Sequence, residues 1–263
     1  MTIRGAIIDL DGTVYRGDEL VDGAQVGIDA IRSAGIEGLF FSNNPLETGE
    51  AYLDRLSGLG LDVAGFQACS SGVVTTEYLA DTHPDAAIFC IGEKELRDQF
   101  IAADLTVTDD PEQAEVVVAS WTPSFDYETM RDALAAVDDE TPFLGTDPDR
   151  TFPMPGGREV PGSGAIVGSV AAVVGRDPDA VLGKPSDVAR DAALSRLGVT
   201  AEECLIVGDR LDTDLRMGQN AGMTTVLVRS GVTDEAEIAT SDVTPEYVIE
   251  RLGQIEQVLD AEQ

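Results

Sequence analysis

Short apolar runs alternate with amphipathic stretches from one end of the chain to the other. Runs such as Ala6-Ile7-Ile8 and Val116-Val117-Val118 are apolar throughout, which is typical of strands covered on both faces of a parallel sheet. The alternation of strand and helix predicts repeated β–α units. We therefore expect an α/β fold built on a doubly wound, Rossmann-like parallel sheet.

The pattern places the expected elements along the chain. Strands are expected near residues 5–9, 37–42, 67–70, 87–91, 115–119, 142–145, 203–208 and 224–228. Helices are expected around residues 24–33, 47–58, 72–81, 93–102, 126–137, 163–174, 186–197, 211–221 and 234–239.

Two stretches that combine breaker residues with charge interrupt this pattern, at His83-Pro84-Asp85 and at 175–179. The segment between them has its own strands and helices and the size of a small domain. We expect a core domain of residues 1–83 and 182–263 with an inserted α/β domain of residues 84–181. The Pro- and Gly-rich stretch 145–164 is expected to be a long loop, and such loops are often functional.

The charge balance argues against one class of partner. The chain has 49 Asp and Glu against 17 Lys and Arg, a formal net charge of −32, which makes nucleic acid an improbable ligand. The acids are spread along the chain, so they indicate a solvated acidic surface. The low lysine content and frequent Asp also suggest a protein adapted to a high-salt cytoplasm, where screening reduces self-repulsion.

The expected compartment is the cytoplasm. Cys69, Cys90 and Cys204 are an odd, widely spaced set, which is typical of buried thiols in a reducing environment. The first residues carry charges where a secretory signal needs its apolar region, and no apolar run approaches the ~18 residues of a membrane span. We therefore expect no membrane association.

Two acidic residues directly follow the first expected strand. Asp9 and Asp11 leave the carboxyl end of the apolar run 5–8, and ligands of open α/β sheets bind at this edge. The alternative is a solvated turn without a function, in which Gly12 permits a backbone conformation that other residues disfavour. Two acids at the end of a buried strand are costly to desolvate without a cation, which favours a site.

A polar group ends the second strand. Ser42, Asn43 and Asn44 provide a hydroxyl and two amides that can donate to phosphoryl oxygens without adding charge. Because Asn44 precedes Pro45, it could instead begin a helix as its N-cap.

Lys184 lies just ahead of a helix expected to begin near Asp187. It is one of two lysines beside 15 arginines, and an ammonium is a compact point charge suited to a phosphate oxygen. An ordinary surface lysine is the alternative. A Walker A loop is excluded, because Pro178 stands where that motif needs its first Gly.

Asp209 ends another apolar strand, and Asp214 falls in the first turns of the following helix. We expect these carboxylates to meet Asp9 and Asp11 at one edge of the sheet. Mg²⁺ fits such a site, because it binds a few carboxylates, keeps waters and bridges to phosphate.

Four motifs occur in order: DLDGT at 9–13, SNN at 42–44, GKPS at 183–186 and GDRLDTD at 208–214. Together they resemble the haloacid dehalogenase superfamily, and within it the 4-nitrophenylphosphatase-like subfamily with a large α/β cap. The resemblance covers nearly the whole chain, and segment 120–127 is similar to the cap of that subfamily. Ser42 stands where many members have Thr, which keeps the hydroxyl.

The resemblance implies Mg²⁺-dependent hydrolysis of a small phosphate monoester, with an aspartyl-phosphate formed on Asp9. Asp11 would protonate the leaving alcohol and then activate water. Asp9, Asp209 and the backbone carbonyl of Asp11 would hold Mg²⁺, and Asp214 would orient its waters.

The same resemblance assigns substrate binding to Ser42, Asn43, Asn44 and Lys184, which would neutralise charge on the transferring oxygens.

Substrate choice would depend on the cap loop 146–157. Phe152 lies near a position where relatives place a substrate-contacting side chain, although a buried cap aromatic is an equal interpretation. The substrate is a small phosphorylated metabolite of open identity: a nucleotide, phosphoglycolate, pyridoxal phosphate or a sugar phosphate. A homodimer is compatible with the family.

Other functions stay open at this point. A phosphotransferase such as a sugar-phosphate mutase uses the same Asp pair, but the 208–214 motif and the large cap favour hydrolysis. A dehalogenase is disfavoured because such relatives lack an equivalent of Asp11. A non-catalytic phosphometabolite-binding protein is the alternative from another class, although every expected catalytic position is filled.

A dinucleotide-binding oxidoreductase is a further alternative with weaker support. Gly162, Gly164 and Gly168 form a glycine-rich helix start, but their spacing is GxGxxxG rather than GxGxxG, and no clear strand precedes them.

Overall fold

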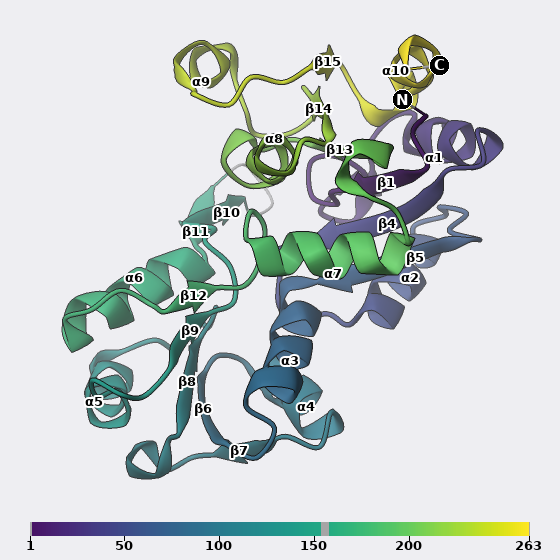
Figure 1. Cartoon of the computed structure of the whole chain (residues 1–263). Coiled ribbons are helices and arrows are strands. Elements are labelled where there is room, and N and C mark those ends of the chain that lie inside the picture. Colours follow the sequence, from purple (N-terminus) through teal and green to yellow (C-terminus); the bar gives the residue numbers. More distant parts are fainter. Residues whose placement is uncertain (1, 154–157, 263) are drawn as a thin grey trace. The chain divides into compact units, whose positions relative to one another are not determined.

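A computed structural model describes residues 2–153 and 158–262 (Figure 1). The chain divides into two compact units, the first formed by Met1–Ser42, Gly49–Cys69 and Lys184–Gln263, and the second by Asn43–Thr48 and Ser70–Gly183. Residues 43–48 and 70–83 thus group with the second unit, whereas the sequence placed all of 1–83 in the core. Hydrogen bonds explain the grouping: Ser71 Oγ donates to the Asn43 carbonyl (2.6 Å), and Gln99 Nε2 donates to the Pro45 carbonyl (2.9 Å).

The first unit contains a six-stranded sheet in the order β15-β14-β13-β1-β4-β5. Its strands are β1 (Gly5–Ile8), β4 (Glu37–Ser42), β5 (Phe66–Ser70), β13 (Cys204–Gly208), β14 (Thr224–Val228) and β15 (Tyr247–Ile249). The pairings of β1 with β4 and β13, of β13 with β14, and of β14 with β15 are parallel.

The strand order reverses between β1 and β13. From β1 the chain proceeds outward to β4 and β5, and the later strands proceed outward in the other direction from β13 to β14 and β15. Such a reversal leaves a crevice at the carboxyl ends of the two central strands, which is where open α/β sheets bind ligands.

Successive residues of a strand point to opposite faces of the sheet, so these apolar strands expose two apolar faces. Helices cover both faces. Ile8 of β1 joins the core formed with helices α1 (Ala24–Ser33), α2 (Gly49–Gly58) and α10 (Glu256–Ala261). Helix α7 (Asp187–Leu197) packs on β1 and β4, while α8 (Arg216–Ala221) packs on β14 and contacts α7. The remaining elements of the unit are α9 (Glu235–Thr240), the hairpin strands β2 (Tyr15–Arg16) and β3 (Glu19–Leu20), and short helical turns at 201–203, 211–215 and 252–254.

The second unit has a five-stranded parallel sheet in the order β12-β9-β8-β6-β7. Its strands are β6 (Ala87–Ile91), β7 (Thr106–Thr108), β8 (Val116–Ala119), β9 (Phe143–Gly145) and β12 (Ala180–Val181). Its helices are α3 (Ser71–Thr82), α4 (Lys94–Ala102), α5 (Tyr127–Ala136) and α6 (Ser163–Val174), with a short helical turn at 111–113. The α/β fold class predicted from the sequence, with its parallel core sheet and inserted α/β unit, is confirmed.

The prediction that residues 145–164 form one long loop is partly wrong. It contains an antiparallel hairpin of β10 (Thr151–Pro153) and β11 (Glu159–Pro161), while residues 154–157 lie outside the described residues. A strand therefore does precede the glycine-rich start of α6, contrary to the sequence interpretation. It belongs to a hairpin and not to a parallel β–α unit, so the dinucleotide-binding motif still lacks its structural context. No helix among the described residues is long and apolar enough to cross a membrane.

Candidate active site

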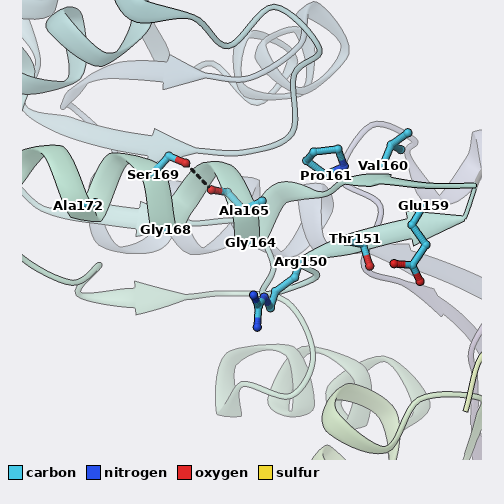
Figure 2. Close-up of a pocket in the computed structure, with 10 residues that line it drawn as sticks. All are labelled: Arg150, Thr151, Glu159, Val160, Pro161, Gly164, Ala165, Gly168, Ser169 and Ala172. Atoms are coloured by element: carbon cyan, nitrogen blue, oxygen red, sulfur yellow. Dashed lines mark hydrogen bonds between the residues drawn. The ribbon is translucent and has the colours of Figure 1, made fainter.

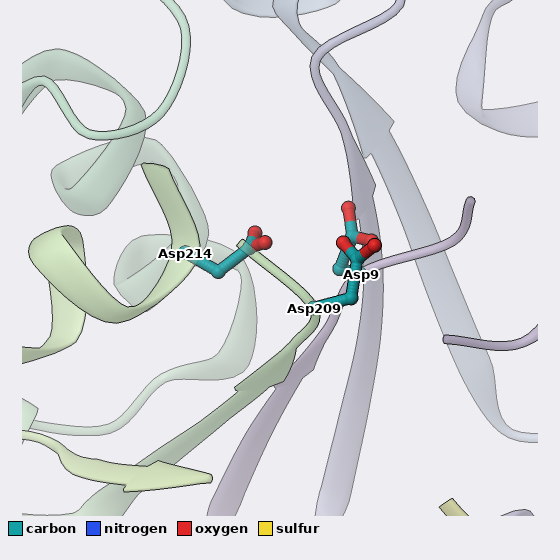
Figure 3. Close-up of side chains that lie close together, drawn as sticks. All are labelled: Asp9, Asp209 and Asp214. Atoms are coloured by element: carbon teal, nitrogen blue, oxygen red, sulfur yellow. The ribbon is translucent and has the colours of Figure 1, made fainter. Parts of the chain in front are cut away.

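Three carboxylates converge at the point where the strand order reverses. One oxygen from each of Asp9, Asp209 and Asp214 lies within 4.8 Å of the others (Figure 3). All three residues are withdrawn from solvent, with 9%, 2% and 1% of their surface exposed. Within the part of the chain that the structure describes, no other group of acidic, His or Cys side chains meets this criterion.

The two central strands place these residues. Asp9 directly follows β1, and its amide donates to the Val207 carbonyl of β13 (2.9 Å), so the sheet pairing continues to the site. Asp209 follows β13. Asp214 lies in the π-helical turn Leu211–Leu215 that begins two residues later, and this turn brings its carboxylate back towards the strand ends.

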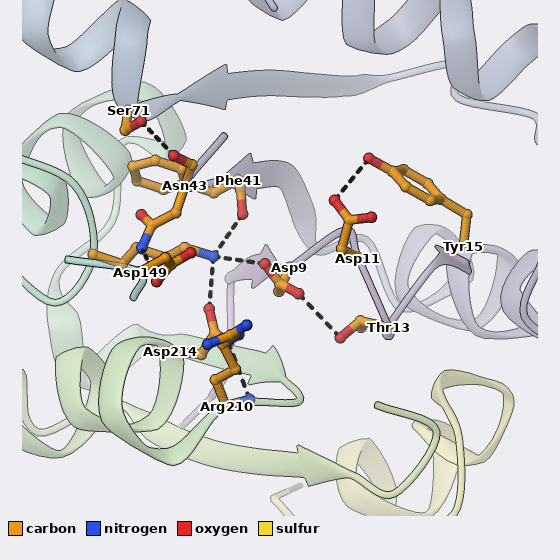
Figure 4. A network of polar contacts seen from close by, with 11 residues as sticks. Asp9, Asp11, Thr13, Tyr15, Phe41, Asn43, Ser71, Asp149, Arg210 and Asp214 are labelled. Atoms are coloured by element: carbon orange, nitrogen blue, oxygen red, sulfur yellow. Dashed lines mark hydrogen bonds and ion pairs between the residues drawn. The ribbon is translucent and has the colours of Figure 1, made fainter. Parts of the chain in front are cut away.

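Lys184 pairs with two of the carboxylates. Its Nζ donates to Asp9 Oδ1 (2.7 Å), to Asp214 Oδ1 (2.6 Å) and to the Phe41 carbonyl (2.7 Å), as Figure 4 shows. Burial alone would lower the pKa of Lys184, but the charges of Asp214 and Asp9 outweigh it and raise the pKa. The lysine is therefore a fully buried cation, and the alternative interpretation of an ordinary surface lysine is wrong.

The local electrostatics favour an additional cation. Burial, together with the charges of Asp9 and Asp214, raises the pKa of Asp209 well above its ordinary value. If all three carboxylates were ionised, one ammonium would leave two negative charges uncompensated, which is costly in a buried site. A divalent ion with a preference for oxygen ligands matches this deficit.

The surrounding backbone leaves room for these carboxylates. A Cβ atom built on Gly231 would lie 1.9 Å from Asp209 Oδ2, and one built on Gly208 would lie 2.4 Å from Asp214 Cγ. Glycine at both positions lets the backbone approach the acidic side chains closely. The Val232 amide donates to Asp209 Oδ2 (2.8 Å) and the Thr233 hydroxyl donates to the Asp209 carbonyl (2.6 Å), so the loop after β14 fixes Asp209.

Asp11 lies beside this cluster in a different environment. Asp11 as a whole residue is exposed to solvent, but the surrounding protein desolvates its carboxyl group. This desolvation and repulsion from Asp9 raise the pKa of Asp11 to about 6, against the opposing effect of a hydrogen bond from Tyr15. A carboxyl group with this pKa can both donate and accept a proton near neutral pH.

The Ser-Asn-Asn motif is divided between the two units. Ser42 ends β4 and is buried. In the second unit, Asn43 donates through Nδ2 to Asp149 Oδ1 (3.2 Å). Asn44 is exposed and accepts from the Leu46 amide (3.1 Å). Because α2 begins only at Gly49, the alternative in which Asn44 caps this helix is wrong.

The second unit holds a buried polar cluster near the end of β9. Asp147 is 2% exposed, and burial and the charge of Asp149 raise its pKa to about 8. The Thr146 hydroxyl donates to Asp147 Oδ2 (3.0 Å), and the Asp149 amide donates to Oδ1 (3.2 Å). These contacts fix the chain at the start of the segment in which the sequence placed substrate selection.

A hollow of about 740 Å³ opens beside the hairpin β10–β11 and helix α6 (Figure 2). Arg150 and Glu159 provide opposite charges to its lining, and small residues of α6 such as Gly164 form one wall. Phe152 is half-buried and packs edge-on against Trp121, with their ring centroids 5.7 Å apart.

The residues that support the carboxylates carry no motif in the sequence. Gly231 and Val232 follow β14, and Phe41 contributes its backbone carbonyl. Contacts through backbone atoms carry no residue-type signal. The available signal was positional, because the loop after β14 leaves the same edge of the sheet as Asp9 and Asp209.

A doubly wound sheet whose reversal point carries clustered carboxylates and a buried lysine defines a class of enzymes that act on phosphorylated or otherwise anionic substrates. Comparison with known proteins identifies the family. Residues 6–106 match the haloacid dehalogenase-like hydrolase family, and residues 181–255 match a HAD-hydrolase-like family. The chain belongs to the haloacid dehalogenase-like hydrolases.

Similar proteins align with almost the whole chain. An acid sugar phosphatase from Staphylococcus haemolyticus is 34% identical over 95% of this chain and 94% of its own. A p-nitrophenyl phosphatase from Archaeoglobus fulgidus has a TM-score of 0.90 at 32% identity, covering 98% of this chain and 100% of its own. A 4-nitrophenylphosphatase from Thermotoga maritima has a TM-score of 0.89 at 30% identity, covering 98% and 97%. The predicted family and the predicted enzyme class, a phosphatase, are confirmed.

Proposed function

We propose that this protein is a Mg²⁺-dependent hydrolase of small phosphate monoesters that forms an aspartyl-phosphate on Asp9. The observation that supports the proposal most strongly is the buried group of Asp9, Asp209, Asp214 and Lys184 at the reversal point of the sheet. The similarity to phosphatases over almost the whole chain supports the same chemistry.

In the first step, a carboxylate oxygen of Asp9 attacks phosphorus and the bond to the leaving alcohol breaks. Asp11 gives its proton to that alcohol. Lys184 holds Asp9 Oδ1 (2.7 Å), which restricts rotation of the nucleophilic carboxylate before attack.

In the second step, water attacks the phosphorus of the aspartyl-phosphate. Asp11, now ionised, takes a proton from this water, inorganic phosphate leaves, and the Asp9 carboxylate is regenerated. A pKa of about 6 suits Asp11 to both steps, because neither protonation state is strongly disfavoured near neutral pH.

The acidic cluster fits a divalent cation, and Asp9, Asp209 and the backbone carbonyl of Asp11 would hold it, with Asp214 orienting its waters. When bound, Mg²⁺ supplies positive charge that offsets the negative charge of the phosphoryl group. Ser42, Asn43, Asn44 and Lys184 are proposed to bind the phosphoryl oxygens through hydrogen bonds. Phosphoryl transfer depends mainly on such positioning and charge compensation.

We assign substrate selection to the second unit, through segment 146–157 and the adjacent hollow that Arg150 lines. A guanidinium group suits the hydroxyl and anionic groups of phosphorylated metabolites. Sugar phosphates are the first esters to examine, because a relative with 34% identity is named an acid sugar phosphatase. Phe152 is a candidate for contact with the substrate. Its edge-on packing against Trp121 equally suits a structural role.

The test is phosphate release from 4-nitrophenyl phosphate and a panel of sugar phosphates, nucleotides, phosphoglycolate and pyridoxal phosphate. We expect release that requires Mg²⁺ and stops with EDTA. Asp9→Asn should remove all measurable turnover, because an amide oxygen is too weak a nucleophile, while the unfolding temperature shows that the variant remains folded. Asp260→Asn, an exposed acid-to-amide change on α10, is the control and should keep full activity.

Three results would contradict the proposal. Substantial turnover by Asp9→Asn would exclude Asp9 as the nucleophile. Binding of these esters without phosphate release would favour the non-catalytic alternative, and transfer of the phosphoryl group to a second sugar would favour a phosphotransferase.

A further inference from the structure

Asp11 has a tyrosine as its side-chain hydrogen-bond partner. The Tyr15 hydroxyl lies 3.1 Å from Asp11 Oδ2 (Figure 4). The two residues also form an isolated β-bridge, and the Gly12 amide donates to the Tyr15 carbonyl (2.8 Å). The turn from Asp11 to Tyr15 is thus closed by backbone and side-chain contacts together.

Tyr15 itself has little freedom to move. Its side chain is fully buried in the core of the first unit, at the start of the hairpin β2–β3. The Arg55 guanidinium lies 4.6 Å from the centre of the ring and also donates to the Gly17 carbonyl (3.0 Å). A cation over the ring and a closed turn hold the hydroxyl at one place.

We propose that Tyr15, supported by Arg55, is a positioning residue that orients the Asp11 carboxyl group for proton transfer to the leaving group. The inference rests on the proposed function, because it assigns to Tyr15 an effect on the acid and base role of Asp11. Neither Tyr15 nor Arg55 belongs to the four sequence motifs that identify the family.

The chemistry follows from which atom carries the proton. A phenol keeps its proton near neutral pH, and an ionised carboxylate has no proton to give, so the Tyr15 hydroxyl donates to Asp11 Oδ2. Because Asp11 Oδ2 accepts this hydrogen bond, the proton of neutral Asp11 belongs on Oδ1. Tyr15 therefore selects both the orientation of the carboxyl group and the oxygen that exchanges a proton.

Without the Tyr15 hydroxyl, the Asp11 side chain can rotate and either oxygen can carry the proton. Only some of these arrangements place the proton towards the leaving alcohol. A correctly placed general acid increases the reaction rate by ~10²- to 10⁴-fold, and part of this increase is then lost. Attack by Asp9 on phosphorus does not involve Tyr15. The loss should therefore grow with the need of the leaving group for a proton.

The experiment compares two esters of similar shape. Phenyl phosphate releases a basic phenolate that benefits from protonation, whereas the nitro group of 4-nitrophenyl phosphate stabilises the phenolate without it. We compare kcat/KM, which covers the steps up to departure of the leaving group and excludes the later attack of water. For Tyr15→Phe we expect kcat/KM to fall about tenfold more for phenyl phosphate than for 4-nitrophenyl phosphate.

Two further variants separate positioning from structure. Tyr247→Phe removes another tyrosine hydroxyl that donates to a carboxylate, Glu262 Oε1 (2.7 Å), and should leave the ratio of the two kcat/KM values unchanged. Asp11→Asn should show the leaving-group effect in full, and adding Tyr15→Phe to it should lower activity no further, because Tyr15 acts through Asp11. Tyr15→Phe keeps the aromatic ring under Arg55, and its unfolding temperature reports whether it folds.

The outcomes distinguish this inference from the proposed function. If Asp11→Asn shows the leaving-group effect and Tyr15→Phe does not, the role of Tyr15 is overturned while that of Asp11 stands. If Asp11→Asn shows no such effect, the acid role of Asp11 fails and the role of Tyr15 fails with it. Equal losses for both esters in Tyr15→Phe alone would mean a structural role only.

Discussion

The two lysines of the chain lie in opposite environments. Lys184 is 1% exposed and contacts two carboxylates, whereas the side chain of Lys94 is 79% exposed and pairs with Asp98 one helical turn away. Exposed pairs of this kind contribute little to stability. A buried ammonium between carboxylates is different, because its removal in the absence of a metal ion leaves buried charges that water does not compensate.

Lys184→Met should therefore lower stability sharply in metal-free buffer. Removal of one member of a buried ion pair costs about 3–5 kcal/mol. We expect Mg²⁺ to recover part of this loss, since a divalent cation offsets the same carboxylates, but phosphatase activity should not return. Thermal unfolding with EDTA and with excess Mg²⁺ measures both effects.

Lys94→Met is the matched control, with the same chemical change at an exposed position. It should change the unfolding temperature and activity very little. An unchanged unfolding temperature of Lys184→Met in EDTA would show that the buried ion pairs contribute no net stability.

At the residue scale, the sequence predicted the charged members of the site and missed its backbone contacts. Asp9 and Asp209 could be predicted because each directly follows an apolar strand, and parallel strands end at one edge. The Phe41 carbonyl that accepts from Lys184 and the Val232 amide that donates to Asp209 depend on tertiary packing. A residue name carries no information about such contacts.

At the scale of elements, the loop after β14 determines how Asp209 is held. The Val232 amide donates to Asp209 Oδ2, and the neighbouring Gly231 leaves space that a side chain would fill. A Cβ atom at Gly231 would lie 1.9 Å from that oxygen, so either the loop or the carboxylate must shift.

Gly231→Ala should weaken the site without unfolding the protein. Groups that orient metal ligands typically change metal affinity or activity by about 10- to 100-fold when they are altered. We expect a loss in this range in the apparent affinity for Mg²⁺, measured by titration of phosphatase activity and by the Mg²⁺-induced rise in unfolding temperature.

Gly58→Ala provides the comparison for this prediction. Gly58 ends α2 and is exposed, and a methyl group added there would meet no neighbouring atom within 4 Å. This variant should keep the Mg²⁺ affinity of the unchanged protein. Equal affinities for Gly231→Ala and Gly58→Ala would exclude a role of the loop in holding Asp209.

The elements themselves differ in how far the sequence predicts them. Apolar runs such as those of β1 and β13 and the periodic helices α1 and α6 were predicted to within one or two residues. Most of the two- and three-residue strands were missed, including β2–β3 and the hairpin β10–β11, whereas the three-residue strand β9 was predicted. Such short strands contain too few residues to show an alternating pattern, and their pairing decides their conformation.

On the scale of the whole molecule, the net charge of −32 is the dominant feature. Arginines are paired with acids at many exposed sites, for example Arg216 with Asp242 and Arg251 with Asp22. With 49 acids and 17 basic residues, such pairs offset only part of the negative charge. The remaining self-repulsion opposes the compact state at low ionic strength.

Salt should therefore stabilise the protein over a defined range. The Debye length falls from about 10 Å at 0.1 M to about 3 Å at 1 M, so screening removes most repulsion between exposed acids in this interval. We expect the unfolding temperature to rise by several degrees between these concentrations in KCl, and equally in NaCl, because screening does not depend on the identity of the cation.

A variant with fewer charges tests whether repulsion is the cause. Asp104→Asn, Asp139→Asn and Asp260→Asn together remove three exposed charges and keep the size of each side chain. The combined variant should unfold at a higher temperature than the unchanged protein at 0.1 M salt and should gain less from added KCl. If both proteins gained equally, the stabilisation would come from exclusion of salt from the surface, and adaptation to high salt through charge screening would have to be abandoned.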